Sequence, residues 1–248
     1  MPDHLEIITS TKNPKLVHIK NLLSDKKYRD EHNEFVVEGN KFIQEISDKD
    51  ISYIASSDPG SLKEAFRNIS FNVQQNIINK ISGTESAQNM IAVVKKPVYS
   101  TKDITPGRWV IAEGIQDPGN LGTIIRTIEA SGAIGLIYTE GTVDPFSPKV
   151  VRASAGSVLH IPLVKVETVA AVKKAVPTMK LVATVITGGT TYTEMKFEPF
   201  CAIVMGSEGQ GLSEQTLRLV DTKVSIPLAG KTESLNVAIT AGVLLFQK

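Results

Sequence analysis

The sequence predicts an α/β protein whose larger, C-terminal domain contains a parallel sheet. From Trp109 onward, short apolar runs alternate with amphipathic segments, which is the pattern of parallel strands joined by helices that cover both faces of the sheet. Before that point, residues 95–107 contain two prolines and few hydrophobic residues, as linkers do. The 248 residues, 42% of them hydrophobic, are enough for one large or two small domains. We therefore expect a first domain at 1–98, a linker at 99–107 and a second domain at 108–248.

The first domain is expected to be a small α/β unit. Leu16, Ile19, Leu22 and Leu23 recur at helical spacing, so an amphipathic helix is predicted over residues 14–24. Short apolar runs predict three strands and one further helix. The strands are expected at 35–39, 51–55 and 90–94, and the helix at 40–47.

The second domain is expected to alternate strands with helices. The strand candidates are 109–113, 134–138, 161–165, 180–186, 200–205 and 223–228. The helix candidates lie near 120–131, 148–156, 167–176, 213–220 and 234–246. The last of these helices is apolar all round, which predicts burial on every side, within the subunit or against a second one.

Charge, cysteine content and apolar runs bear on nucleic-acid binding, disulfide bonding and membrane insertion. The 27 basic and 26 acidic residues give a net charge of +1, so no bulk electrostatic signal for nucleic acid exists. A modest basic excess lies in the first 29 residues, and a solvated helix face explains it equally well. The single cysteine, Cys201, excludes an internal disulfide framework and fits a reducing compartment. With no secretory signal and no long uncharged apolar run, the protein is expected to be cytoplasmic and without a membrane span.

Several common motifs are missing from the sequence. The dinucleotide fingerprint GxGxxG does not occur, and neither do HExxH, CxxC or GxSxG. The four histidines are scattered along the chain, so they suggest neither a metal site nor a histidine base. His160, just before a predicted strand, is most simply a half-buried structural residue.

Three segments instead place Gly, Asn, Ser or a charge where a predicted strand runs into a loop or helix. They are 117–126, 205–211 and 226–236. Ligand sites of open α/β sheets form at such places. The sequence therefore indicates an enzyme whose active site is assembled from three separated loops.

Each polar residue of these loops also has a purely structural interpretation. Asn120 could cap the helix that follows it, and Ser234 reads first as the cap of the last helix. Arg126 could form a surface ion pair, and Glu208 could be a solvated turn residue among three glycines. Asn236, placed inside an apolar helix, would be a buried polar group that needs a partner.

Taken together, the three loops resemble the three motifs of the SpoU/TrmH family of RNA ribose 2′-O-methyltransferases, within the SPOUT superfamily. The resemblance covers roughly residues 108–248, in the family's order. The matching residues are Asn120-x-Gly122-x-x-x-Arg126, Gly206-x-Glu208-x-x-Gly211 and Ile226-Pro-Leu followed by Ser234-Leu-Asn236-Val-Ala. The N-terminal region resembles the family's small substrate-binding domain, related to ribosomal RNA-binding proteins. That likeness is carried by Ser10-x-x-Asn13-Pro14 and Phe35-Val-Val-Glu38-Gly39.

The resemblance implies a C-terminal trefoil knot, S-adenosylmethionine as cofactor without a metal, and a homodimer. Carried over by position, the cofactor would be held by Thr184, Gly206, Ile226, Leu228 and Leu235. The catalytic pocket would be formed by Asn120, Arg126, Glu208, Ser234 and Asn236.

Within that pocket, Arg126 is expected to bind the phosphate next to the target ribose and to steer the hydroxyl, in its own subunit or across the dimer. A role as general base is physically awkward, because a guanidinium group is almost always protonated.

The expected substrate is structured RNA, ribosomal RNA in view of the N-terminal resemblance, with tRNA as the alternative. RNA contacts are expected from Lys12, Lys15, Lys20, Arg29 and Arg152.

Two other functions remain open at this point. A catalytically silent RNA-binding relative would use the same fold, although the intact polar motif residues argue against it. A nucleotide-dependent dehydrogenase with a degenerate fingerprint would bind NAD and use an acid or base such as His160.

Overall fold

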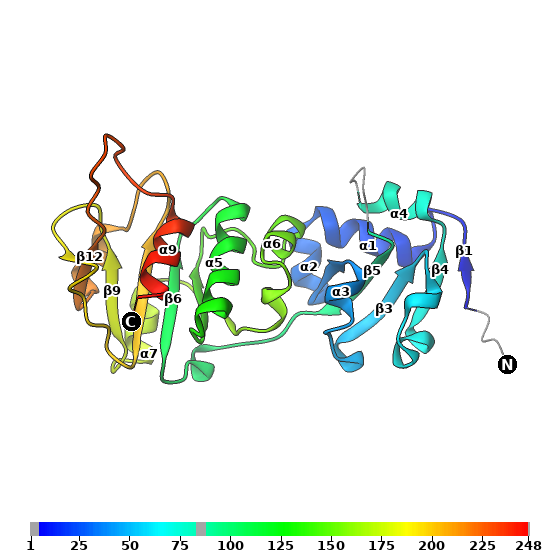
Figure 1. Ribbon diagram of the computed structural model, residues 1–248. Coiled ribbons are helices and arrows are strands. Elements are labelled where there is room, and N and C mark those ends of the chain that lie inside the picture. Colours follow the sequence, from blue (N-terminus) through cyan, green and yellow to red (C-terminus); the bar gives the residue numbers. More distant parts are fainter. Residues whose placement is uncertain (1–4, 83–87, 248) are drawn as a thin grey trace. The chain divides into compact units, whose positions relative to one another are not determined.

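The computed structural model describes residues 5–82 and 88–247. The chain forms two compact units, which Figure 1 shows in the colours of the sequence. The first comprises Met1–Pro97 together with Phe146–Arg152, and the second comprises Val98–Pro145 and Ala153–Lys248. No sequence pattern indicated that a segment from within the second predicted domain would join the first unit.

The first unit contains a mixed five-stranded sheet in the order β1-β4-β3-β5-β2. Strands β1, β4 and β3 run parallel, whereas β5 is antiparallel to both β3 and β2. The strands are β1 (Ile7–Ile8), β2 (Glu34–Glu38), β3 (Ile51–Ser56), β4 (Ser70–Val73) and β5 (Met90–Lys95). The helices are α1 (Pro14–Ser24), α2 (Lys26–His32), α3 (Asn40–Ile43), α4 (Gln75–Ser82) and α6 (Pro148–Ala153), whose first five residues belong to this unit.

The predicted helix over residues 14–24 is confirmed as α1. Asn13 caps it by accepting a hydrogen bond from the Lys15 amide, and Pro14 occupies the first turn, where its missing N–H costs nothing. The predicted apolar positions of its inner face are fully buried in the core of the first unit. The helix predicted at 40–47 is shorter, ending at Ile43. The sequence analysis missed β1, α2, α4 and β4.

The second unit is built on a seven-stranded sheet in the order β10-β12-β9-β11-β6-β7-β8. Every strand pair in it is parallel, which confirms the predicted parallel sheet. The strands are β6 (Arg108–Glu113), β7 (Gly135–Thr139), β8 (Leu163–Val166), β9 (Lys180–Thr184), β10 (Thr190–Thr191), β11 (Cys201–Gly206) and β12 (Thr222–Ser225). The helices are α5 (Pro118–Ser131), α7 (Val169–Ala175), α8 (Glu214–Leu219) and α9 (Val237–Leu245).

The segment expected as a linker, 99–107, is folded into the second unit. Ser100 and Asp103 form a capping box around a short 3₁₀ helix, Thr101–Asp103. Ile104 is buried in the core of this unit, and Tyr99 packs against the same core. The low hydrophobic content of residues 99–107 was therefore misleading. One buried isoleucine and one capping box hold this segment in the second unit.

Helix α9 lies beside α5 and is held at its end by Arg108, the first residue of β6 (Figure 1). The Arg108 Nη1 group donates to the carbonyls of Leu244, Leu245 and Gln247 over 3.2–3.5 Å. The same guanidinium lies 4.5 Å from the centre of the Phe197 ring. One side chain thus satisfies carbonyls at the end of α9 that have no partner within the helix.

We predict that Arg108→Ala lowers the free energy of unfolding by about 2 kcal/mol, since it removes charge-assisted hydrogen bonds that are partly shielded from water. Urea denaturation of the two proteins measures this difference. The matched control is Arg218→Ala, because Arg218 is 80% exposed and pairs only with its helical neighbour Glu214 among the ion pairs described. That control should change stability by less than about 0.5 kcal/mol. Equal effects of the two substitutions would contradict the role of Arg108.

Candidate active site

The carboxyl ends of β9, β11 and β12 border a cavity of about 480 Å³. Because the strands are parallel, these ends meet at one edge of the sheet, where ligand sites of open α/β sheets form. All five residues expected to hold a cofactor line this cavity: Thr184, Gly206, Ile226, Leu228 and Leu235. Three of the expected catalytic residues, Glu208, Ser234 and Asn236, line it as well.

A tight loop after β11 forms one wall of the cavity. The amide of Ser207 donates to the carbonyl of Gly211 at 3.2 Å, and the amide of Gly211 donates to the carbonyl of Ser207 at 2.9 Å. Gly206 lies against the closing end of this loop. A Cβ atom on Gly206 would lie 2.2 Å from the carbonyl carbon of Gly211, so no other residue fits without moving the loop.

Two side-chain hydrogen bonds join the three motif loops. The Asn120 amide nitrogen donates to Oε1 of Glu208 at 2.8 Å. The Asn236 amide nitrogen donates to Oδ1 of Asn120 at 2.9 Å. The participants are 88 and 116 residues apart in the chain, so the sheet brings together the motifs that the sequence showed only as separate segments.

The structure corrects the predicted helix caps. Asp117, not Asn120, caps α5 by accepting a hydrogen bond from the Asn120 amide at 2.7 Å, which leaves the Asn120 side chain free for Glu208 and Asn236. Asn236, not Ser234, caps α9, and its Oδ1 accepts from the amides of Ala238 and Ile239. Asn236 is therefore an exposed capping residue, and the expectation that it is buried inside the helix was wrong.

Arg126 lies on α5, six residues after Asn120, and its side chain is exposed. Its neighbours Ile124, Ile125 and Ile128 are fully buried and anchor the helix, so the guanidinium is presented from a rigid element. Arg126 is not part of the cavity lining, nor of the hydrogen-bonded chain between the loops. It stands on the same helix as Asn120 with no protein contact that fixes its end group among the interactions described.

Of the five residues expected to contact RNA, four are exposed on the first unit: Lys12, Lys15, Lys20 and Arg152. Lys12, Lys15 and Lys20 lie at the start of α1 or along it, and Lys15 also pairs with Glu6 at 3.0 Å. These positions are compatible with a contact to a phosphate group.

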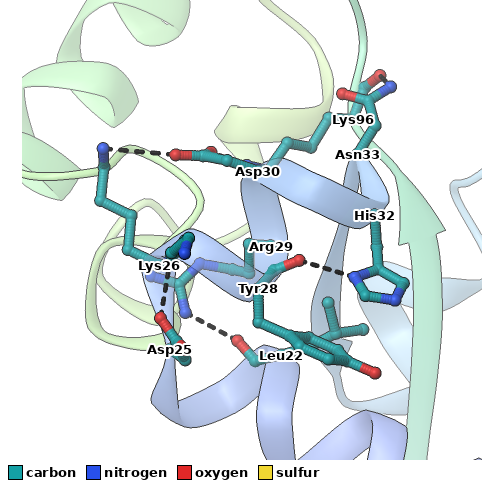
Figure 2. A network of polar contacts seen from close by, with 10 residues as sticks. Leu22, Asp25, Lys26, Tyr28, Arg29, Asp30, His32, Asn33 and Lys96 are labelled. Carbon is teal, nitrogen blue, oxygen red and sulfur yellow. Dashed lines mark hydrogen bonds and ion pairs between the residues drawn. The ribbon is translucent and has the colours of Figure 1, made fainter.

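Arg29 does not have such a position. Figure 2 shows its guanidinium turned into the first unit, where Nη1 donates to the Leu22 carbonyl at 2.7 Å. The residue is only 4% exposed. Arg29 connects α2 to the end of α1, so the expectation that it contacts RNA was wrong, because spacing alone does not tell which face of a short helix is covered.

Arg152, which was expected beside the catalytic pocket, belongs to the first unit and is exposed there. Its Nη1 lies 3.5 Å from Oε1 of Glu38, whose side chain is 8% exposed. Burial raises the pKa of the Glu38 carboxyl, and the charge of Arg152 opposes that rise. Nearby, Phe146 packs against Phe35 with ring centres 4.9 Å apart, so the segment 146–152 is bound by both polar and apolar contacts.

The sequence analysis missed several residues of the cavity. Gln210, Val237, Thr240 and Leu244 line it without having been singled out. The three closely spaced glycines did signal a tight loop, but nothing in the sequence distinguished Thr240 or Leu244 from other residues of an apolar helix.

The profile of the SpoU rRNA Methylase family matches residues 107–246, more than half of the sequence. The chain belongs to the SpoU rRNA methylase family. A second profile, described as the MRM3-like substrate binding domain, matches residues 13–92 of this SpoU-family chain. These matches confirm the family that the three motifs indicated and the N-terminal domain that accompanied it.

Relatives of known name match nearly the whole length of this SpoU-family chain. The 23S rRNA (guanosine(2553)-2′-O)-methyltransferase RlmP of Bacillus subtilis is 31% identical over 246 residues, which cover 96% of this chain and 97% of that protein. The AdoMet-bound rRNA methyltransferase from Sinorhizobium meliloti has a TM-score of 0.89 at 31% identity, covering 97% of this chain and 96% of that one. The SpoU methyltransferase AviRb from Streptomyces viridochromogenes, in complex with AdoMet, has a TM-score of 0.84 at 27% identity, with coverages of 95% and 96%.

In this SpoU-family chain, we predict that Gly206→Ala opens the loop that closes at Gly211. Overpacking of this kind costs about 1–3 kcal/mol, and the amides of Ser207 and Gly211 should lose protection from hydrogen exchange. Gly209→Ala is the matched control, because a Cβ atom there meets nothing within 4 Å. Unchanged protection in Gly206→Ala would show that the loop yields at no cost.

Proposed function

We propose that this SpoU-family protein transfers a methyl group from S-adenosylmethionine to a ribose 2′-hydroxyl of ribosomal RNA. The observation that carries the proposal is the cavity at the sheet edge, whose three motif loops are joined by Asn120, Glu208 and Asn236. The full-length relative from Bacillus subtilis, whose name states 2′-O-methylation of 23S rRNA, supports the same reaction and substrate.

The cavity suits a cofactor of this size and chemistry. Its volume of about 480 Å³ lies within the range of small-molecule sites, and its lining combines aliphatic side chains with backbone groups of a glycine-rich loop. The absence of a side chain on Gly206 lets the main chain approach a ligand closely. The two AdoMet-bound relatives support this assignment. When bound, S-adenosylmethionine supplies a methyl group that its sulfonium already makes electrophilic, so the reaction calls for no metal.

The chain's own residues would act mainly by positioning. Asn120, Glu208 and Asn236 fix the loops against one another, and Ser234 adds a hydroxyl to the cavity wall. Arg126, carried on a helix with a buried apolar face, would bind the phosphate beside the target ribose and orient its 2′-hydroxyl. Orientation of two reactants is sufficient for a large part of the rate of a transfer reaction. The 2′-hydroxyl proton released on transfer passes to water, and because guanidinium groups are almost always protonated, we assign Arg126 no role as a base.

Ribosomal RNA is preferred over tRNA because the names of the full-length relatives from Bacillus subtilis and Sinorhizobium meliloti both state an rRNA methyltransferase. The intact polar motif residues argue against a catalytically silent relative. Family membership argues against a dehydrogenase, and His160 lies 2.6 Å from Glu129 of α5 and outside the cavity lining.

The described residues include no helix that is long and apolar enough for a membrane span. An rRNA substrate and a buried free Cys201 fit a cytoplasmic protein.

We also propose that the C-terminal unit is knotted and that the protein is a homodimer. The order of the sheet, in which β11 lies between β6 and β9, is compatible with a chain that threads back through its own loops. Ile239 and Phe246, on α9 and just after it, are 56% and 60% exposed. These apolar groups would be covered by a second copy, as the apolar character of the helix suggests.

The first test of this function maps 2′-O-methylation in ribosomal RNA from cells with and without the protein. One ribose should lose its methyl group on deletion and regain it when the wild-type protein is restored. Restoration with Arg126→Ala should fail, with a single-turnover rate reduced on the order of 100-fold in the purified enzyme. Arg126→Lys should also be poor, since an ammonium does not reproduce a planar two-pronged contact.

The control for this test is cofactor binding. Both Arg126 variants should bind S-adenosylhomocysteine like the wild type in calorimetry with metal-free buffer. A near-normal rate of Arg126→Lys would refute the positioning role, and folded wild-type protein that binds neither S-adenosylmethionine nor its product would refute the function.

For the assembly, we predict that Ile239→Asp weakens the dimer, because a carboxylate would have to be buried in an apolar contact. Light scattering at micromolar concentration should report a dimer for the wild type and a larger monomer fraction for the variant. Val98→Asp provides a comparison that should leave the dimer unchanged, since Val98 is also exposed, at 82%, but lies outside α9 and the cavity lining. A wild-type monomer with full activity would overturn the dimer proposal.

For RNA capture, we predict that the triple substitution of Lys12, Lys15 and Lys20 by alanine weakens RNA binding and flattens its salt dependence, because each lost phosphate contact lowers the salt slope by about one unit. Filter binding over a range of salt concentrations measures both effects, and cofactor binding should be unchanged. Lys102→Ala, an exposed lysine of the second unit, is the control. Unchanged affinity in the triple variant would remove α1 from the RNA-binding surface.

A further inference from the structure

The loop between β11 and α8 begins and ends beside the same residue, Glu113. Glu113, the last residue of β6, is the sheet partner of Gly206, where the loop leaves β11. At the other end of the loop, the Ser213 hydroxyl donates to Oε1 of Glu113 at 2.8 Å, and the Ser213 amide lies 3.3 Å from Oε2. The residues between these two points, 207–212, all line the large cavity.

A third hydrogen bond makes this arrangement specific for a carboxylate. Thr216, which is 2% exposed, donates from its hydroxyl to Oε1 of Glu113 at 2.7 Å. A carboxylate accepts from all three donors at once. A glutamine could keep the two hydroxyl contacts at its carbonyl oxygen, but its NH₂ group would then face the N–H of Ser213. A shorter or apolar side chain would leave the buried Thr216 hydroxyl without this acceptor.

We propose that Glu113 is a positioning residue for the methyl donor site. Its carboxylate fixes the point at which loop 207–212 returns to the sheet, and thereby the Gly206–Gly211 closure that borders the cofactor cavity. Glu113 does not line the 480 Å³ cavity and belongs instead to a smaller cavity of about 230 Å³, so it acts through the loop. The proposal rests on the proposed function of that site.

The decisive experiment compares the effect of a Glu113 variant on the KM for the cofactor with its effect on the KM for RNA. If Glu113 positions the cofactor wall, Glu113→Ala should raise the KM for S-adenosylmethionine and the Kd for S-adenosylhomocysteine about tenfold or more, as expected when several hydrogen bonds to one charged group are lost. The KM for RNA and the kcat at saturating cofactor should stay close to wild type. Glu113→Gln, which keeps one acceptor oxygen, should fall between the two.

The matched control is Glu214→Ala. Glu214 is another glutamate, on the first turn of α8, but it is 88% exposed and pairs with Arg218. This variant should have wild-type values for both substrates. All variants are made in the full chain, and calorimetry with S-adenosylhomocysteine gives Kd independently of turnover.

Two results would overturn the proposal. One is an unchanged cofactor Kd in Glu113→Ala, and the other is an equal loss in cofactor KM, RNA KM and kcat, which a general loss of structure would produce. If the alanine variant does not fold, the glutamine variant decides by the same measurements.

Failure of the proposed function is distinguishable from failure of this inference. A wild-type protein that binds no S-adenosylhomocysteine contradicts the function. The loop is then followed in the ligand-free protein by hydrogen exchange at the amides of Ser207 and Gly211. Loss of their protection in Glu113→Gln supports the positioning role, and unchanged protection overturns it.

Discussion

The candidate site depends on the hydrogen-bonded chain Asn236–Asn120–Glu208, which crosses between segments that have no peptide connection nearby. An asparagine suits this task because its side chain offers both a donor and an acceptor. Asn120 uses its oxygen toward Asn236 and its nitrogen toward Glu208, and Asn236 uses its oxygen to cap α9. The side chain of Asn236 therefore holds both the start of α9 and the wall of the cavity, so that a shift of one displaces the other.

The hydrogen bonds among Asn236, Asn120 and Glu208 can form because other groups fix the helices and strands on either side of them. Asp117 takes over the capping of α5, and Arg108 holds the far end of α9. The parallel sheet aligns the strand ends at one edge, and the missing side chain of Gly206 allows the loop to close against it. The polar residues at the carboxyl edge of the sheet are therefore held by rigid elements. Positioning in a transfer reaction requires such rigidity.

Much of this architecture follows from local sequence patterns. Apolar periodicity identified α1 and the parallel sheet, and the three polar loops marked the edge at which the cavity lies. The caps were wrong because two competent residues lie close together at each helix start, Asp117 with Asn120 and Ser234 with Asn236. The choice between them depends on where the chain leaves the preceding strand. Arg29 was misjudged for a related reason, because the sequence pattern does not show which face of α2 is covered.

The grouping of Phe146–Arg152 with the first unit has a consequence for how the protein can be divided. The chain passes between the units at 97/98, 145/146 and 152/153, so no single cut yields two complete folding units. Cleavage before Val98 would strip Phe146 of Phe35 and leave Glu38 buried without the cation of Arg152. An exchange of N-terminal domains between members of the family would have to move 146–152 along with residues 1–97. If the protein evolved by simple fusion of two domains, segment 146–152 and the residues of the first unit that contact it would have had to adapt to each other by later substitutions.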